Sequence, residues 1–169
     1  MNSIELKSLQ APLKEKYRNE PASAMITLKA VGKVGEGISC SIESGRALIE
    51  AGLHPATGGT GLLACSGDLL LEALVACAGV TLRAVATAIG VEIKNGVVKA
   101  EGDLDFRGTL GVSKEIPVGF QSIRLQFNLD SNATAEQLES ISKLTERYCV
   151  VYQTLTKAVS IETQYHLSQ

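Results

Sequence analysis

The chain has 169 residues, 45% of them hydrophobic and 20% charged, and its formal net charge is −2. This length suits one domain with a real core, and this composition is globular and argues against disorder. No basic cluster stands out, so nucleic acid and membranes are poor partners. The N-terminal segment is charged and lacks the apolar stretch of a secretory signal, and we therefore expect a cytoplasmic protein.

The first part of the chain predicts an arm followed by three strands. Residues 1–21 are polar and contain two prolines, so we expect an N-terminal arm or short helix, followed by a single domain over 22–169. Strands are predicted at 24–30, 38–42 and near 47–49, with glycines marking the turns between them. They would form an antiparallel three-stranded meander.

The segment 68–89 is the longest apolar stretch and predicts a buried helix. At about 100° per residue, Asp68, Glu72 and Arg83 fall on one narrow stripe, and the charges inside the segment favour a soluble core helix over a membrane span. The opposite face is apolar or weakly polar and includes a thiol: Leu70, Leu74, Cys77, Thr81, Ala84 and Ala88. Ser66 is the expected N-cap, and Gly90 is expected to end the helix.

The second half of the chain predicts two or three strands, a second helix and a final strand. Strands are expected at 97–102, around 105–112 and at 122–129, the last with a clear alternation of apolar and polar residues. Thr134 and Gln137 form a capping box that opens a helix over 134–155, with a break near Tyr148. A last strand is expected at 159–167. The order indicates an α+β fold, and the extent of the apolar surface on segment 68–89 favours an intertwined homodimer.

Two of the four cysteines are candidates for chemistry. Cys77 and Cys149 each lie on or beside the apolar stripe of a long helix, whereas Cys40 and Cys65 fit packing positions. No C-x-x-C motif occurs and the two histidines lie far from any thiol in sequence, so no zinc signature is present. A buried cysteine is often a small core residue, but nearby positive charge, such as Arg147, would lower a thiol pKa.

Two cysteine segments, SGDLLLEALVACAGVTLRAVA and ERYCVVYQTL, resemble those of the OsmC/Ohr family of osmotically inducible and organic hydroperoxide resistance proteins. The resemblance covers roughly residues 22–167 and implies an α+β homodimer with a thiol site at each subunit interface. HPATGG and DFRGTLGV resemble marks of a subgroup.

The resemblance also implies a peroxidase that reduces organic hydroperoxides and needs no bound cofactor. Cys77 would attack the peroxide, Cys149 would resolve the sulfenic acid as a disulfide, and an external dithiol would reduce that disulfide. An arginine and a glutamate usually polarise the reactive thiol. The glutamate would fall at Gly67, beside Asp68, and the arginine near Lys33. The other cationic candidates are Arg18, Arg46 and Arg107.

Two other functions remain open from the sequence. The chain could be a non-enzymatic module that binds a small apolar or thiol-bearing molecule, with both cysteines as lining. A metal-dependent hydratase or hydrolase built on His54 is the third hypothesis, although no second ligand lies at helical spacing.

Overall fold

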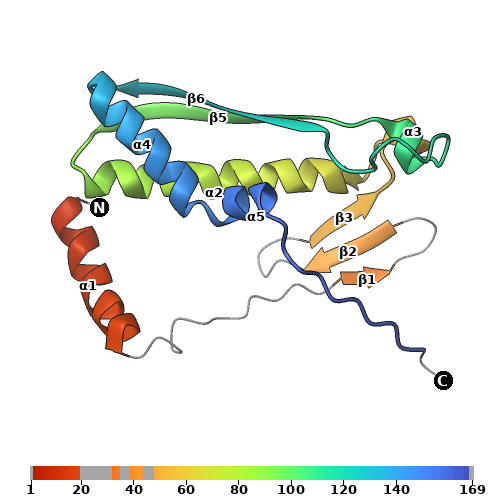
Figure 1. Ribbon diagram of the computed structural model, residues 1–169, viewed down its shortest axis with the longest axis horizontal. Coiled ribbons are helices and arrows are strands. Elements are labelled where there is room, and N and C mark those ends of the chain that lie inside the picture. The colour runs from red at the N-terminus through yellow and green to blue at the C-terminus, as the bar shows by residue number, and fades with distance from the viewer. Residues whose placement is uncertain (1, 20–31, 35–38, 44–47, 168–169) are drawn as a thin grey trace.

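One long helix, α2 (Ser66–Ala88), runs through the middle of the computed structural model, which describes residues 2–19, 32–34, 39–43 and 48–167 (Figure 1). The predicted helix is confirmed. Its N-cap is Cys65, without a side-chain cap bond, so the prediction of Ser66 as cap is wrong: Ser66 already belongs to the first helical turn. Gly90, with φ of 76°, ends the helix as predicted, because its left-handed backbone conformation costs glycine little.

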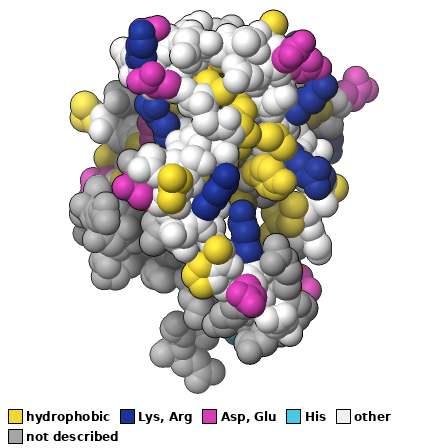
Figure 2. Space-filling model, turned by 90° about the vertical axis from the view of Figure 1, so that its left-hand side faces the viewer, with side chains coloured by type: hydrophobic (Ala, Val, Ile, Leu, Met, Phe, Trp, Pro, Cys, Tyr) yellow, Lys and Arg dark blue, Asp and Glu magenta, His cyan; other side chains and the backbone are white. Residues whose placement is uncertain are grey.

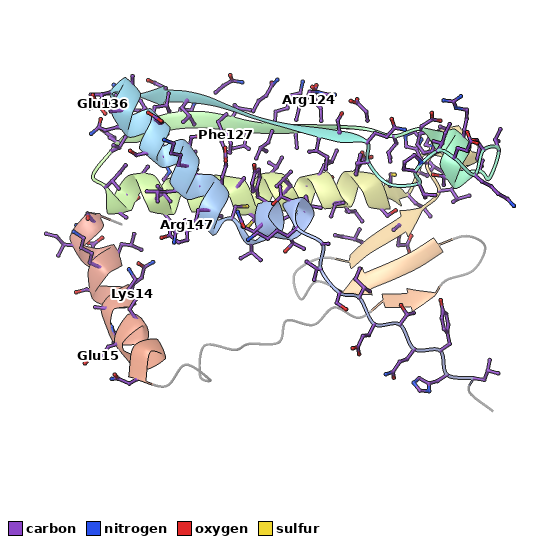
Figure 3. All side chains as sticks on the ribbon, in the orientation of Figure 1. Lys14, Glu15, Arg124, Phe127, Glu136 and Arg147 are labelled. Atoms are coloured by element: carbon purple, nitrogen blue, oxygen red, sulfur yellow. The ribbon has the colours of Figure 1, made fainter. Side chains whose placement is uncertain are left out.

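A two-stranded antiparallel hairpin, β5 (Ile93–Asp103) and β6 (Ser122–Ser131), lies along α2. Side chains of a strand alternate between its two faces. On β6, Arg124 accordingly points away from α2 and Phe127 points toward it (Figure 3). The two sequence-predicted strands at 97–102 and 122–129 are therefore confirmed, and both extend further than predicted.

Two consecutive helices, α4 (Ala135–Tyr148) and α5 (Val150–Thr156), also pack on α2. The predicted capping box is present: Gln137 N–H donates to the Thr134 hydroxyl, and Thr134 N–H donates to the Gln137 side chain. The predicted break near Tyr148 is confirmed, because Cys149 has an extended backbone conformation and separates the two helices.

The core lies between α2, the hairpin and these two helices, in two clusters of buried side chains. One contains Leu82, Val85, Ala86, Val91, Ile93 and Ile141, and the other contains Leu74, Ala78 and Cys149. The face of α2 that is buried thus differs from the predicted one, which shares only Leu74 with it. The difference arises because the hairpin and α4 select which side of a nearly uniformly apolar helix is covered.

A second sheet has the order β1 (Gly32–Val34), β2 (Ser39–Glu43), β3 (Leu48–Gly52) and β4 (Ala64–Cys65). The predicted second and third strands and their antiparallel pairing are confirmed. The predicted strand at 24–30 lies outside the described residues. Residues 32–34, which begin with the first glycine of the expected turn, form β1 instead, because pairing with β2 overrides the turn preference of glycine.

The segment 105–112 is not a strand: Phe106–Thr109 form the short helix α3. Asp105 caps it by accepting a hydrogen bond from Arg107 N–H. A Cβ at Gly108 would lie 2.8 Å from the carbonyl oxygens of Ile116 and Pro117, so the backbone there folds tightly on the following loop. Such a compact turn is incompatible with an extended strand.

At the N-terminus the helical alternative is present but longer than predicted, whereas the C-terminus differs from its prediction. Residues 3–19 form a full helix, α1 (Ser3–Asn19), which contains Pro12 and contacts α2. The predicted strand at 159–167 is not formed, because no strand among the described residues pairs with it. Its alternating apolar side chains are exposed: Val159, Ile161, Tyr165 and Leu167. The division into an arm over 1–21 and a domain over 22–169 stays a prediction.

Candidate functional site

Cys77 lies in the middle of α2, on the side that faces α5. Its side chain is half-buried and packs against the cluster formed by Leu74, Ala78 and Cys149. The helix holds the thiol on a rigid element, and Thr81, one turn further along, lies within hydrogen-bonding reach of the sulfur.

Cys149 lies at the joint between α4 and α5 and is 1% exposed. Its backbone N–H still donates to the Thr145 carbonyl at 2.9 Å, so it ends α4. Its Sγ also accepts a hydrogen bond from Tyr152 N–H at 3.5 Å, so the same residue caps α5. This double role places the sulfur at the first turn of α5, where unpaired backbone N–H groups gather.

The structure brings the two predicted thiols together and shifts their pKa values in opposite directions. Burial by itself raises the pKa of Cys77. Hydrogen bonds from Val151 N–H, the Cys149 thiol, Val150 N–H and the Thr81 hydroxyl outweigh burial, so the net pKa of Cys77 is lowered. The groups that favour the thiolate form of Cys77 all belong to its own chain.

The pKa of Cys149 is raised, first because burial disfavours its charged form and also because its proton is donated to Cys77. Cys77 is therefore the more acidic thiol of the pair, and Cys149 holds its proton more tightly. This is the arrangement of a nucleophile beside a thiol that can later form a disulfide with it.

Two predicted supporting residues, Asp68 and Arg107, lie near the N-terminal end of α2, away from Cys77. Asp68 is nine residues before Cys77, which corresponds to about 13 Å along a helix, so the two side chains of one chain cannot meet. Arg107, in α3, donates from Nε to Asp105 at 3.0 Å. The ion pair raises the pKa of Arg107 and lowers that of Asp105. Neither residue polarises Cys77 within a single chain.

The remaining cationic candidates are not placed at the site. Lys33 is in β1 and Arg18 is in α1, but their side chains lie outside the described part of the chain, as does Arg46 entirely. The groups that sequence reasoning missed are the two backbone N–H donors at Val150 and Val151. The predicted helix break near Tyr148 was the signal for them, since a new helix begins where one ends.

The two motifs HPATGG and DFRGTLGV meet beside the N-terminal end of α2, near α3 (Figure 1). The His54 ring stacks on Phe106 with 5.0 Å between centroids. His54 Nδ1 accepts a hydrogen bond from Ala56 N–H at 3.0 Å and thereby caps the short 3₁₀ turn at Pro55–Thr57. No group of three or more potential metal ligands occurs among the described residues, and His54 acts here as a turn cap.

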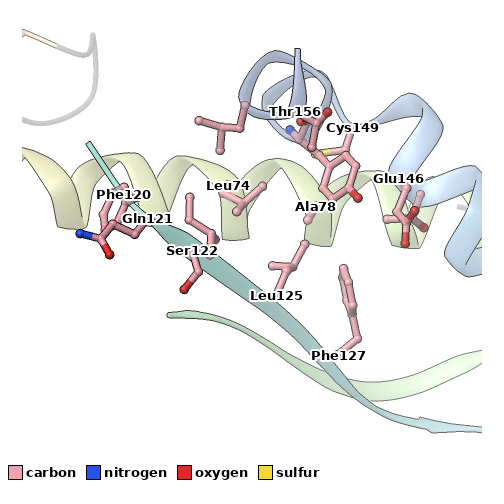
Figure 4. Close-up of a pocket in the computed structure, with 14 residues that line it drawn as sticks. Leu74, Ala78, Phe120, Gln121, Ser122, Leu125, Phe127, Glu146, Cys149 and Thr156 are labelled. Carbon is pink, nitrogen blue, oxygen red and sulfur yellow. Dashed lines mark hydrogen bonds between the residues drawn. The ribbon is translucent and has the colours of Figure 1, made fainter. Parts of the chain in front are cut away.

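A hollow of about 470 Å³ opens on the other side of Cys149, between β6 and the helices α4 and α5 (Figure 4). Leu125 and Phe127 line it from β6, and Cys149 and Thr156 line it from the helices. The hollow is mostly apolar and does not include Cys77.

The sequence of residues 59–164 matches the family described as OsmC-like protein. No curated protein sequence matches the chain significantly.

Solved structures of similar fold cover most of the chain. An OsmC-like protein from Mycoplasma pneumoniae has a TM-score of 0.64 at 19% identity, over 78% of this chain and 88% of that one. An OsmC-like protein of unknown function from Vibrio cholerae has a TM-score of 0.63 at 15% identity, over 77% and 94%.

One such structure carries a functional name. The organic hydroperoxide resistance protein OsmC from Legionella pneumophila has a TM-score of 0.61 at 15% identity, over 78% of this chain and 91% of that one. At these identities the structural likeness establishes the fold alone. The apolar helix α2, although long enough to cross a bilayer, is the core helix of that fold. The α+β architecture of the chain and the family match over residues 59–164 show that the chain belongs to the OsmC-like protein family.

Proposed function

We propose that the protein is a thiol peroxidase that reduces organic hydroperoxides, with Cys77 as the reactive and Cys149 as the resolving cysteine. The observation that carries this proposal is the contact between the two thiols together with their opposite pKa shifts. Organic hydroperoxide resistance proteins among the structures of similar fold are consistent with it.

The first step uses the thiolate form of Cys77, which the lowered pKa favours. The thiolate attacks the distal oxygen of ROOH, the O–O bond breaks, and RO⁻ leaves and takes a proton to become the alcohol. Cys77 is then a sulfenic acid. Cys149 attacks the sulfenic sulfur, water leaves, and a Cys77–Cys149 disulfide forms. An external dithiol reduces that disulfide by thiol–disulfide exchange and is itself oxidised.

The thiolate in this proposal is stabilised mainly by its own chain. The amides of Val150 and Val151 and the hydroxyl of Thr81 take the part for which a cationic side chain would otherwise be needed. No cofactor is required by this chemistry, and the need for an external dithiol places the protein in the reducing cytoplasm.

We further propose that the protein functions as a homodimer. Large apolar side chains remain exposed on the single chain, including Val80 on α2 at 73% and Ile161 at 86%. Figure 2 shows hydrophobic side chains open to solvent between lysine and arginine side chains on one face. A second copy would cover such surface, would be the source of an acidic group such as Asp68 at Cys77, and would be a further source of cationic groups such as Lys33.

The test combines thiol titration and intact mass with one equivalent of cumene hydroperoxide. The expected result is loss of two thiols and a Cys77–Cys149 disulfide that a dithiol reverses. C77S should abolish turnover, C149S should react once without forming that disulfide, and C65S, at a half-buried position away from the pair, should turn over normally. Unchanged consumption by C77S contradicts the proposal, as does retention of all thiols in the parent protein.

A further inference from the structure

The space between α4 and β6 is hollow along much of its length. One part, of about 470 Å³, adjoins Cys149, and a second part, of about 550 Å³, lies further along β6. Phe127 and Thr145 line both parts. Volumes of this size are in the range of small-molecule sites, which run from about 300 to 1,000 Å³.

Thr145, at the boundary of the two parts, carries an unpaired buried hydroxyl. The residue is 2% exposed, and its Oγ1 has no hydrogen-bond partner in the part of the chain that the structure describes. A buried hydroxyl without a partner is uncommon and destabilising, because its hydrogen bonds to water are lost on burial and no protein hydrogen bond replaces them.

Other helical threonines of the same chain show that this is not a general feature. Thr87 donates to the Arg83 carbonyl at 2.8 Å, and Thr154 and Thr156 donate to the carbonyls of Val150 and Tyr152 at 2.9 Å. Each uses the usual partner four residues earlier. Thr145 does not make that bond, and no other described residue pairs with its hydroxyl, so the hydroxyl is open to a ligand group.

The remaining lining restricts the charge of such a group. Apolar residues from β6 and α2 dominate, including Leu74, Ile123 and Leu125. Glu146 lines the first part, and no lysine or arginine among the described residues lines either part. A carboxylate would face Glu146 without a cation to pair with, so an anionic amphiphile is disfavoured.

We propose that this hollow binds a neutral amphiphile, an aliphatic chain with a hydroxyl group, whose hydroxyl pairs with Thr145 while its chain lies along Leu125 and Phe127. An alcohol both donates and accepts, as the threonine hydroxyl does. The site does not depend on hydroperoxide reduction: Cys149 contributes to its lining and Cys77 does not.

The test is calorimetric titration of the full chain with 1-octanol and with octanoate. We expect octanol to bind and octanoate to bind at least tenfold more weakly. T145V, which replaces the hydroxyl with a methyl group of similar size, should weaken octanol binding about two- to tenfold, and T145S should bind like the parent. The melting temperature of unliganded T145V should equal or exceed that of the parent, since it loses no satisfied bond.

Three results would overturn the proposal. One is equal binding of octanol by the parent and T145V, and another is octanoate binding as tight as octanol. The third comes from L125W, which fills the hollow: it should abolish octanol binding without changing the oligomeric state. If L125W instead disrupts association, a second copy fills the hollow. Titration of C77S, which should bind octanol normally, separates this proposal from the peroxidase.

Discussion

Removal of the Cys149 thiol should make Cys77 a poorer nucleophile at neutral pH. In the structure the Cys149 thiol donates to Cys77 and contributes to the lowered pKa of Cys77. C149A removes this donor, whereas C149S supplies a hydroxyl donor in the same place. C149S also keeps an acceptor for Tyr152 N–H, which C149A lacks. The comparison therefore tests the hydrogen bonds of the side chain at residue 149 while both variants lack the resolving sulfur.

The magnitude follows from the energy of a hydrogen bond to a charged group. Such a bond contributes about 1.5–3 kcal/mol, and each 1.36 kcal/mol changes the thiolate fraction tenfold. About half of that effect on rate is recovered, because a more basic thiolate is a better nucleophile. We therefore expect C149A to alkylate at Cys77 about three- to twelvefold more slowly than C149S at pH 7.

The assay is the rate of Cys77 alkylation by iodoacetamide against pH, under anaerobic reducing conditions, with the modified peptide identified by mass. The midpoint of the C149A profile should lie above that of C149S, and C149S should stay close to the parent. The donors at Val150, Val151 and Thr81 remain in both variants, so C149A should keep part of its reactivity. Coincident profiles for C149A, C149S and the parent would refute the hydrogen-bond argument.

Three further predictions concern stability. Ile141 is 1% exposed in the core, so I141A should lower the free energy of unfolding by about 2–5 kcal/mol in urea titrations, whereas L138A, at a position 48% exposed on the same helix, should cost far less. Loss of the capping box in T134A should cost about 1 kcal/mol by the same measurement, and a T134S variant that matched T134A would contradict the capping role. The pKa of Asp103 lies well below its usual range, because Arg124 and Ser122 donate to it. The carboxylate therefore stabilises the fold above about pH 4, the pKa of an unfolded aspartate, and this contribution is lost as the pH falls toward the lowered folded value. D103N should remove that part of the acid dependence of the urea midpoint. An unchanged midpoint profile from about pH 5 to about pH 2 would argue against this role of Asp103.

Local signals determined the elements that the sequence predicts well. The capping box at Thr134 and Gln137 opens α4 because both bonds are made within one turn. The alternation in residues 122–129 needs only the two-residue repeat of a strand, and the end of α2 needs only the left-handed conformation at Gly90. In each case the deciding interactions lie within a few residues along the chain.

Local patterns gave wrong predictions where the segment's packing or strand-pairing partner is remote in sequence or absent among the described residues. DFRGTLGV has residues compatible with a strand, but a close approach to the loop at 116–117 makes it a helical turn. Residues 159–167 have the alternation of a strand and no strand to pair with among the described residues. β1 forms through pairing with β2 in spite of its glycine.

The sequence by itself determined which residues are candidates for chemistry: the two cysteines, one in each helical segment. Only the tertiary structure decided that they touch, which of the two thiols is the more acidic and which amides lower its pKa. It also separated them from Asp68 and Arg107 and left the Thr145 hydroxyl without a partner among the described residues. The physical reason is that acidity depends on burial and hydrogen bonds between segments more than 70 residues apart, and no pattern along the chain encodes those contacts.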